Sequence, residues 1–70
     1  MRLNINGQTK DIARDKLTIS ELLVLQNVEA PDMVSVQLNG EFVQRADFTA
    51  VSLKENDAVD FLYFMGGGQQ

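Results

Sequence analysis

The chain has 70 residues, 44% of them apolar, and its six Lys and Arg against ten Asp and Glu give a formal net charge of −4. A chain of this length forms one domain that buries only about 60% of its unfolded surface, so we expect no deep, enclosed active-site cleft. It contains no cysteine and no histidine, which excludes a disulfide framework, a thiolate nucleophile and the commonest general base, and argues against an independent enzyme.

Two Asn-Gly pairs predict two β-hairpins. Asn6-Gly7 and Asn39-Gly40 each supply the two positive-φ residues of a type I′ turn, and each follows a segment in which apolar and polar residues alternate. The predicted arms are residues 2–5 with 8–12, and residues 34–38 with 41–44.

One helix is predicted between the hairpins. Thr18 followed by Glu21 is a capping box, in which each side chain satisfies a free backbone N–H at the start of a helix. The helix should begin at Ile19 and end around Asn27. Its apolar stripe, which can lie on a sheet, is formed by Ile19, Leu22 and Leu23.

The last third of the chain predicts an irregular segment and a final strand. Residues 44–54 contain apolar side chains that can cover the core, and Ala58 to Met65 read as a strand. If that strand pairs with the first, the order β-β-α-β-β-loop-β forms an α+β fold called a β-grasp, or ubiquitin-like fold, with about five strands in a mixed sheet on one main helix. The predicted domain spans residues 1–65, and residues 66–70 form a flexible C-terminal tail. The predicted core is Leu3, Ile5, Leu22, Leu23, Val36, Leu38, Val59 and Phe61.

The final strand has apolar residues on both faces. If Phe61 completes the core, Leu62 and Phe64 point to the open face of the sheet, where an exposed apolar patch marks an interface. The alternative is that residues 44–54 cover them. Arg45 is either an anchor for a carboxylate of a partner or a surface charge, and the sequence leaves both open.

Charge and composition restrict the partners. A net charge of −4 repels phosphate backbones and anionic membrane surfaces, so we expect a protein partner, with no nucleic acid and no membrane. No carboxylate pair has the spacing of a metal site, and no metal or bound cofactor is expected. The lack of cysteine, of a signal peptide and of an apolar run near 20 residues predicts a cytoplasmic chain. We also expect a monomer when the chain is alone, although the sequence does not determine its oligomeric state.

Three consecutive glycines, Gly66 to Gly68, follow the final strand and precede Gln69 and Gln70. A segment without side chains can enter a channel that would reject any Cβ, which suits insertion into the active site of another protein. The alternative is a frayed terminus, where disorder is common.

The assembled pattern resembles the ThiS/MoaD family of ubiquitin-like sulfur-carrier proteins, most closely its thiamin branch. The matching stretches are residues 18–23, 36–43 with Arg45 after them, 53–61 and 65–68. The resemblance implies a carrier that is not itself an enzyme. An E1-like adenylyltransferase would use MgATP to adenylylate its C-terminal glycine, a cysteine desulfurase would be the source of the sulfur that forms a thiocarboxylate, and thiazole synthase would receive it.

By the same resemblance the reacting residue is Gly68, with Gly67 and Gly66 leading to it. Members of the family end at the second glycine of a Gly-Gly pair, and this chain continues with Gln69 and Gln70. Either the two glutamines are foreign to the natural chain, or this member has lost or altered the carrier role, or, as we expect, a peptidase removes them. The surface that docks partners is expected to be Leu62, Phe64, Met65 and Arg45. The alternatives are a sulfur carrier for another pathway such as molybdopterin synthesis, a non-covalent β-grasp interaction module, and a ubiquitin-like modifier joined to lysines.

Overall fold

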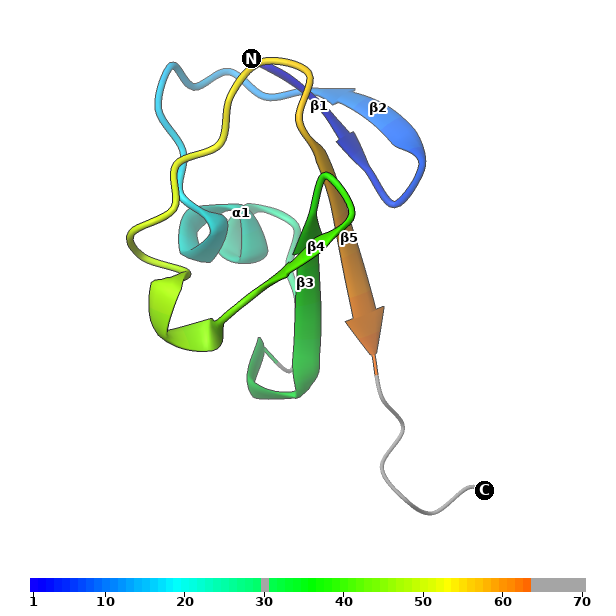
Figure 1. The fold of residues 1–70 in the computed structure, drawn as a ribbon. Helices are drawn as coiled ribbons and strands as arrows, with labels where there is room; N and C mark the ends of the chain where they lie inside the picture. Colours follow the sequence, from blue (N-terminus) through cyan, green and yellow to red (C-terminus); the bar gives the residue numbers. More distant parts are fainter. Residues whose placement is uncertain (30, 64–70) are drawn as a thin grey trace.

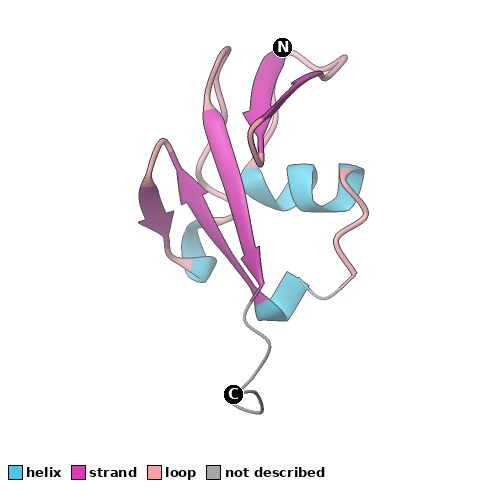
Figure 2. Ribbon diagram, turned by 90° about the vertical axis from the view of Figure 1, so that its right-hand side faces the viewer, coloured by secondary structure: helices cyan, strands magenta, loops and turns pink. Residues whose placement is uncertain are grey.

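The computed structural model describes residues 1–29 and 31–63 of the chain (Figure 1). Within them five strands form one mixed sheet in the order β2-β1-β5-β3-β4, and the helix α1 lies on one side of it (Figure 2). The elements are β1 (Arg2–Ile5), β2 (Gln8–Asp11), α1 (Ile19–Leu25), the 3-10 turn η1 (Pro31–Met33), β3 (Val34–Leu38), β4 (Glu41–Val43), the 3-10 turn η2 (Arg45–Asp47) and β5 (Ala58–Tyr63). The predicted β-grasp arrangement is confirmed.

Both predicted hairpins are present, and their turns have the expected backbone. Asn6 and Gly7 have φ values of 51° and 83°, and Asn39 and Gly40 have values of 52° and 88°. These are the left-handed conformations of a type I′ turn, which Asn and Gly adopt at low cost. The strands β2 and β4 each end one residue before the predicted limit.

The helix begins where the capping box predicts and ends earlier than expected. The Thr18 N–H donates to Glu21 Oε1 at 2.9 Å, and the Glu21 N–H donates to Thr18 Oγ1 at 3.2 Å. The last helical residue is Leu25, and Asn27 has a φ of 57°. A residue in this left-handed conformation just after a helix ends it, so the expected end at Asn27 was two residues too late.

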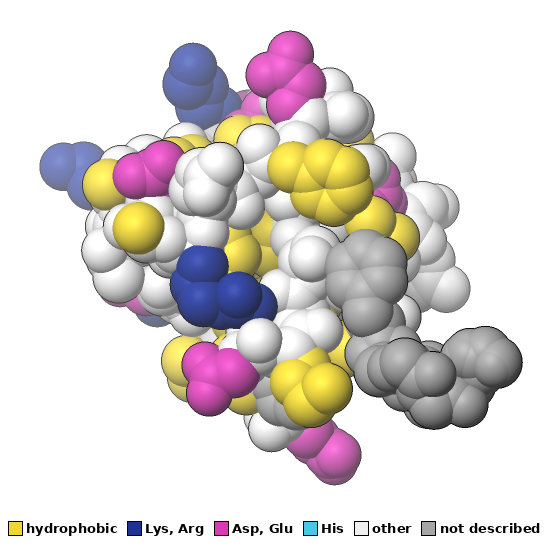
Figure 3. Space-filling model, turned by 60° about the horizontal axis from the view of Figure 1, so that its bottom comes forward, with side chains coloured by type: hydrophobic (Ala, Val, Ile, Leu, Met, Phe, Trp, Pro, Cys, Tyr) yellow, Lys and Arg dark blue, Asp and Glu magenta, His cyan; other side chains and the backbone are white. Residues whose placement is uncertain are grey.

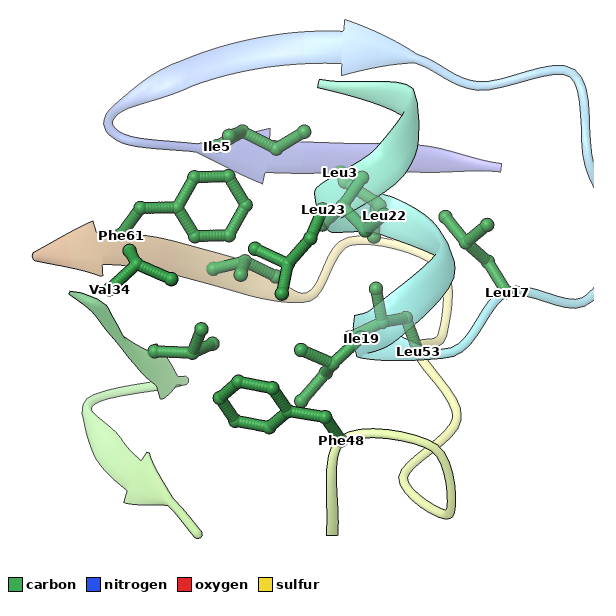
Figure 4. Packing of buried hydrophobic residues seen from close by; sticks show 12 residues of the cluster. Leu3, Ile5, Leu17, Ile19, Leu22, Leu23, Val34, Phe48, Leu53 and Phe61 are labelled. Atoms are coloured by element: carbon green, nitrogen blue, oxygen red, sulfur yellow. The ribbon is translucent and has the colours of Figure 1, made fainter. Parts of the chain in front are cut away.

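The core lies between α1 and the sheet (Figure 4). Its buried side chains are Leu3, Ile5, Leu17, Ile19, Leu22, Leu23, Val34, Val36, Phe48, Leu53, Val59 and Phe61. One predicted core residue was wrong, because Leu38 is only partly buried. Leu38 is the last residue of β3, next to the Asn39-Gly40 turn, and lies at the margin of the packed layer. In the described ranges no helix has the length and apolar character to cross a membrane.

The segment 44–54 lies on the side of the sheet that carries the helix. Its backbone bonds to the start of α1, with the Ser20 N–H donating to Phe48 O at 3.0 Å and the Leu53 N–H donating to Leu17 O at 2.8 Å. The side chains of Phe48 and Leu53 complete the core, as predicted. This segment therefore does not cover the opposite, open face of the sheet.

Candidate functional site

The strand β5 is central in the sheet, and in the sequence the first glycine, Gly66, follows its last residue by three positions. It pairs in parallel with β1 and antiparallel with β3, and its last pair joins Tyr63 to Val34. The predicted site residues Phe64, Met65, Gly66, Gly67 and Gly68 all lie outside the described residues, as does the predicted domain limit at residue 65. Gly68 follows Tyr63 by five residues, and five residues span at most about 18 Å when fully extended.

Leu62 lies on the open face of the sheet, as its alternation with the buried Phe61 predicts. It is half-buried, and its cross-strand partner is Ser35 of β3. Because residues paired across neighbouring strands share a face, Gln37 of β3 and its partner Phe42 of β4 lie on the same open side. The open face thus carries an apolar side chain on β5 and another on β4.

Phe42 is a candidate docking residue that sequence reasoning missed. Its side chain is 64% exposed, the highest value for an aromatic residue in the described part of the chain. The available signal was the alternation in Glu41-Phe42-Val43, where Val43 packs against the core and Phe42 must then point outward. Because aromatic residues are enriched at protein interfaces, Phe42 is a candidate for contact with a partner.

More apolar surface lies where β5 ends. Tyr63 is 53% exposed and Met33, at the end of η1 beside β3, is 56% exposed. Figure 3 shows an end of the molecule on which several separate hydrophobic patches surround Lys and Arg side chains. Leu62, Phe42, Tyr63 and Met33 therefore give the chain exposed apolar side chains on the open face and at the end of β5.

Arg45 does not extend freely into solvent. Its Nη2 atom donates to the carbonyl oxygens of Asp32 and Val34, both at 2.8 Å, with Pro31 O more distant at 3.3 Å. Its Cζ atom lies 5.9 Å from the centre of the Phe48 ring. The structure thus brings Arg45 and Leu62 to the same end of β3, but the guanidinium is bound to backbone of its own chain.

The two ion pairs of the described residues lie away from the end of β5. Arg2 pairs with Asp11 at 3.0 Å and Arg14 with Glu21 at 3.4 Å, and all four side chains are exposed. The Thr18 backbone N–H that donates to Glu21 lowers the pKa of this carboxyl, and the Arg14 charge lowers it further. In residues 1–29 and 31–63 no cluster of Asp and Glu could hold a metal ion.

The fold and the site define a class of protein, a small β-grasp domain whose last strand leads into a glycine segment. Solved structures agree with this description. A crystal structure of the thiamine biosynthesis protein (ThiS) from Geobacter metallireducens matches with a TM-score of 0.89 and 43% identity, covering 97% of this chain and all of that one. A solution structure of a thiamine biosynthesis protein from the same organism matches with a TM-score of 0.82 and 42% identity, covering 100% and 91%.

Sequence comparison identifies the family. The model of the ThiS family matches residues 3–68. The sulfur carrier protein ThiS of Bacillus subtilis is 30% identical over 66 residues, which are 94% of this chain and 98% of that protein. A thiazole synthase of Magnetococcus marinus is 35% identical over 69 residues, 99% of this chain but only 21% of that protein, so the chain spans about a fifth of this relative. The chain belongs to the ThiS family.

Proposed function

We propose that this chain is a sulfur carrier of thiamin biosynthesis that carries its sulfur as a thiocarboxylate on Gly68. The observation that carries the proposal is the extent of the family match, which begins at Leu3 and ends on Gly68. The B. subtilis relative is named a sulfur carrier protein, and its alignment with this chain covers 98% of its length. The chain is then a protein substrate, with a folded domain that presents one reactive carboxyl group.

The proposed chemistry explains the three glycines. An oxygen of the Gly68 carboxylate attacks the α-phosphorus of MgATP in the site of an E1-like adenylyltransferase, and pyrophosphate leaves. The outer sulfur of a persulfide, whose source is a cysteine desulfurase, then displaces AMP from the acyl carbon to form an acyl disulfide. A thiol cleaves this disulfide, which releases the thiocarboxylate and leaves the second sulfur in a new disulfide. Because these steps occur inside other proteins, side chains on residues 66–68 would obstruct entry.

A free carboxylate at Gly68 requires that the bond to Gln69 be broken. In the sequence Gly68 is followed by Gln69 and Gln70, so its carbonyl carbon is part of a peptide bond. An amide oxygen is a poor nucleophile toward ATP, whereas a carboxylate is a competent one. We therefore propose that a peptidase hydrolyses the Gly68–Gln69 bond before adenylylation.

Thiazole synthase is the proposed acceptor of the sulfur. The relative from M. marinus supports this, because a segment similar to this whole chain makes up 21% of a thiazole synthase. A carrier and an acceptor that form parts of one protein in one organism are expected to meet as separate proteins in another. Since the adenylylation consumes ATP, we place the proposed reaction in the cytoplasm. We also propose that the free carrier is a monomer.

Docking is proposed to use the open face of the sheet near the end of β5. Leu62 and Phe42 lie on this face, and Phe64 and Met65 follow Tyr63 directly. The reach of about 18 Å from Tyr63 to Gly68 requires that the active site of a docked partner lie close to this surface. Arg45 was also predicted to dock, but its guanidinium donates to three carbonyl oxygens of its own chain.

The experiment that tests the proposal compares two forms of the chain with the E1-like partner of its host. A chain that ends at Gly68 is expected to support exchange of pyrophosphate into ATP, and the 70-residue form is not. With sulfur donor added, intact mass should show that one oxygen of the shorter form is replaced by sulfur. Equal adenylylation of the 70-residue form would refute the cleavage step. If neither form reacts, a non-covalent interaction module is the better assignment.

Docking is tested separately with charge substitutions on the open face. Phe42→Glu should weaken binding of the chain to the E1-like partner or to thiazole synthase and leave its urea midpoint nearly unchanged, because the side chain is mostly exposed. The matched control is Val24→Glu on α1, where the native side chain is 75% exposed but belongs to the helix side. If Phe42→Glu and Val24→Glu bind both partners like the native chain, the open face is not the docking surface.

A further inference from the structure

A side chain continues the pairing of β1 with β5 beyond the point where β1 turns. The last backbone pair of these strands is Ile5 with Val59, and Asn6 already has the positive φ of the turn. The Asn6 N–H still donates to Val59 O at 2.9 Å, and Asn6 Oδ1 accepts from the Phe61 N–H at 2.8 Å. The side-chain oxygen thus takes the place of a backbone carbonyl, two residues before Tyr63.

The side chain of Arg45 binds β3, the other neighbour of β5. Val34 begins β3 and is paired with Tyr63, the last described residue of β5. The Val34 carbonyl accepts from Arg45 Nη2 at 2.8 Å, a bond that is partly buried. Arg45 also lies against Phe48, which belongs to the core. The start of β3 is therefore tied to the packed layer at the position where it holds the end of β5.

We infer that Asn6 and Arg45 are positioning residues that hold the end of β5 from both sides, so that the segment carrying Gly68 starts from a fixed point beside the docking surface. The inference rests on the proposed carrier function. Terminal strand residues fray unless they are tied down. Each frayed residue must be ordered again before Gly68 can reach the active site of a docked partner, which lowers the rate of adenylylation and not the affinity of docking.

The two hairpins provide a matched pair of variants for Asn6. Asn39 occupies the same position of the second turn, with a φ of 52°, and its Oδ1 accepts from the Ala58 N–H at 2.9 Å. Asn6→Gly and Asn39→Gly both keep the positive φ and remove one acceptor from β5. The first removes it near Tyr63, the second at the beginning of the strand.

We expect Asn6→Gly to raise amide hydrogen exchange at residues 61–63 and to lower kcat for adenylylation of the chain ending at Gly68, each by about two- to tenfold, the range of one net hydrogen bond. KM for the carrier should change less than about twofold, a difference too small to represent a lost hydrogen bond. Asn39→Gly also loses the bond from Asn39 Nδ2 to Asp57 at 3.0 Å, yet should leave kcat unchanged.

Arg45→Gln is compared with Arg14→Gln, which removes the same charge from the loop before α1, where Arg14 pairs with Glu21. Arg45→Gln should lower kcat with KM retained and raise exchange at residues 61–63, and Arg14→Gln should do neither. Arg45→Lys should restore part of the rate, because an ammonium group can still donate to the Val34 carbonyl. A rise in KM at constant kcat would overturn the positioning role of Arg45 and establish it as a docking residue.

All rates are measured where urea titration shows each variant to be folded. Faster exchange at residues 61–63 without a fall in kcat would mean that Asn6 and Arg45 only stabilise the fold, and would overturn the inference. Unchanged exchange in both variants would overturn it as well. If the native chain ending at Gly68 is not adenylylated, the proposed function fails, and hydrogen exchange still decides whether the two side chains hold β5.

Discussion

Truncation of Leu22 tests the packing of α1 on the sheet. The side chain is completely buried between helix and strands, and Leu22→Ala removes three carbon atoms from it. Transfer alone accounts for about 2.4 kcal/mol at about 0.8 kcal/mol per methylene, and the cavity left behind raises the loss to as much as about 5 kcal/mol. A domain of this size has only about 4 to 10 kcal/mol in total.

The assay is urea unfolding followed by circular dichroism. With an m-value of about 1 kcal/mol/M, the expected fall in midpoint is about 2 M or more. Leu25→Ala is the matched control, because it makes the same change in the same helix at a side chain that is 43% exposed, and its cost should be less than half as large. Equal midpoints for the native chain and Leu22→Ala would show that α1 does not pack as the structure describes.

Three further predictions concern the helix start, the first turn and the segment after β5. Because the pKa of Glu21 is lowered in the folded chain, its ionised form stabilises the fold above its ordinary pKa of 4.5 and this is lost as pH falls. The difference in stability between the native chain and Glu21→Gln should thus shrink below that pH, and a difference constant down to acid would refute the capping role. Gly7→Ala should cost about 1 kcal/mol in urea unfolding, from its positive φ alone, since nothing lies within 4 Å of an added Cβ; a loss several times larger would contradict this geometry. Phe64→Glu should abolish partner binding and leave folding intact, and an unfolded variant or one with native affinity would remove Phe64 from the docking surface.

The parts of the fold that were predicted correctly depend on short sequence patterns. The two Asn-Gly pairs placed both hairpins, and Thr18 with Glu21 placed the start of α1, because each signal lies within four residues and has one dominant geometry. The alternation in β5 correctly placed Phe61 inside and Leu62 outside. These patterns also define the topology, since two hairpins around one helix leave few ways to close a sheet.

The wrong or missing predictions concern the burial and backbone conformation of residues at the ends of elements, which depend on tertiary packing. Leu38 alternates in step with the core residues of β3. It is nevertheless only partly buried, because it lies beside the turn at the end of the strand. The end of α1 was misplaced because Asn27 carries no helix-ending signal as clear as glycine, although its left-handed backbone has the same effect. Phe42 was overlooked because the alternation in this three-residue strand does not show by itself which face is buried. The direction of Phe42 follows only once Val43 is known to pack against the core.

Arg45 shows why the role of a charged residue cannot be assigned from its type and place in the sequence. An arginine after a β-hairpin is equally suited to a partner carboxylate and to carbonyl groups of its own chain, and the carbonyls it contacts lie 11 to 14 residues earlier. The bond from Phe61 to Asn6 spans 55 residues. In the proposed carrier function the reacting Gly68 follows Tyr63 by five residues, so the last described strand should be held at a defined place. Contacts that meet this requirement must come from neighbouring strands of the sheet, and they become visible only once the sheet is assembled.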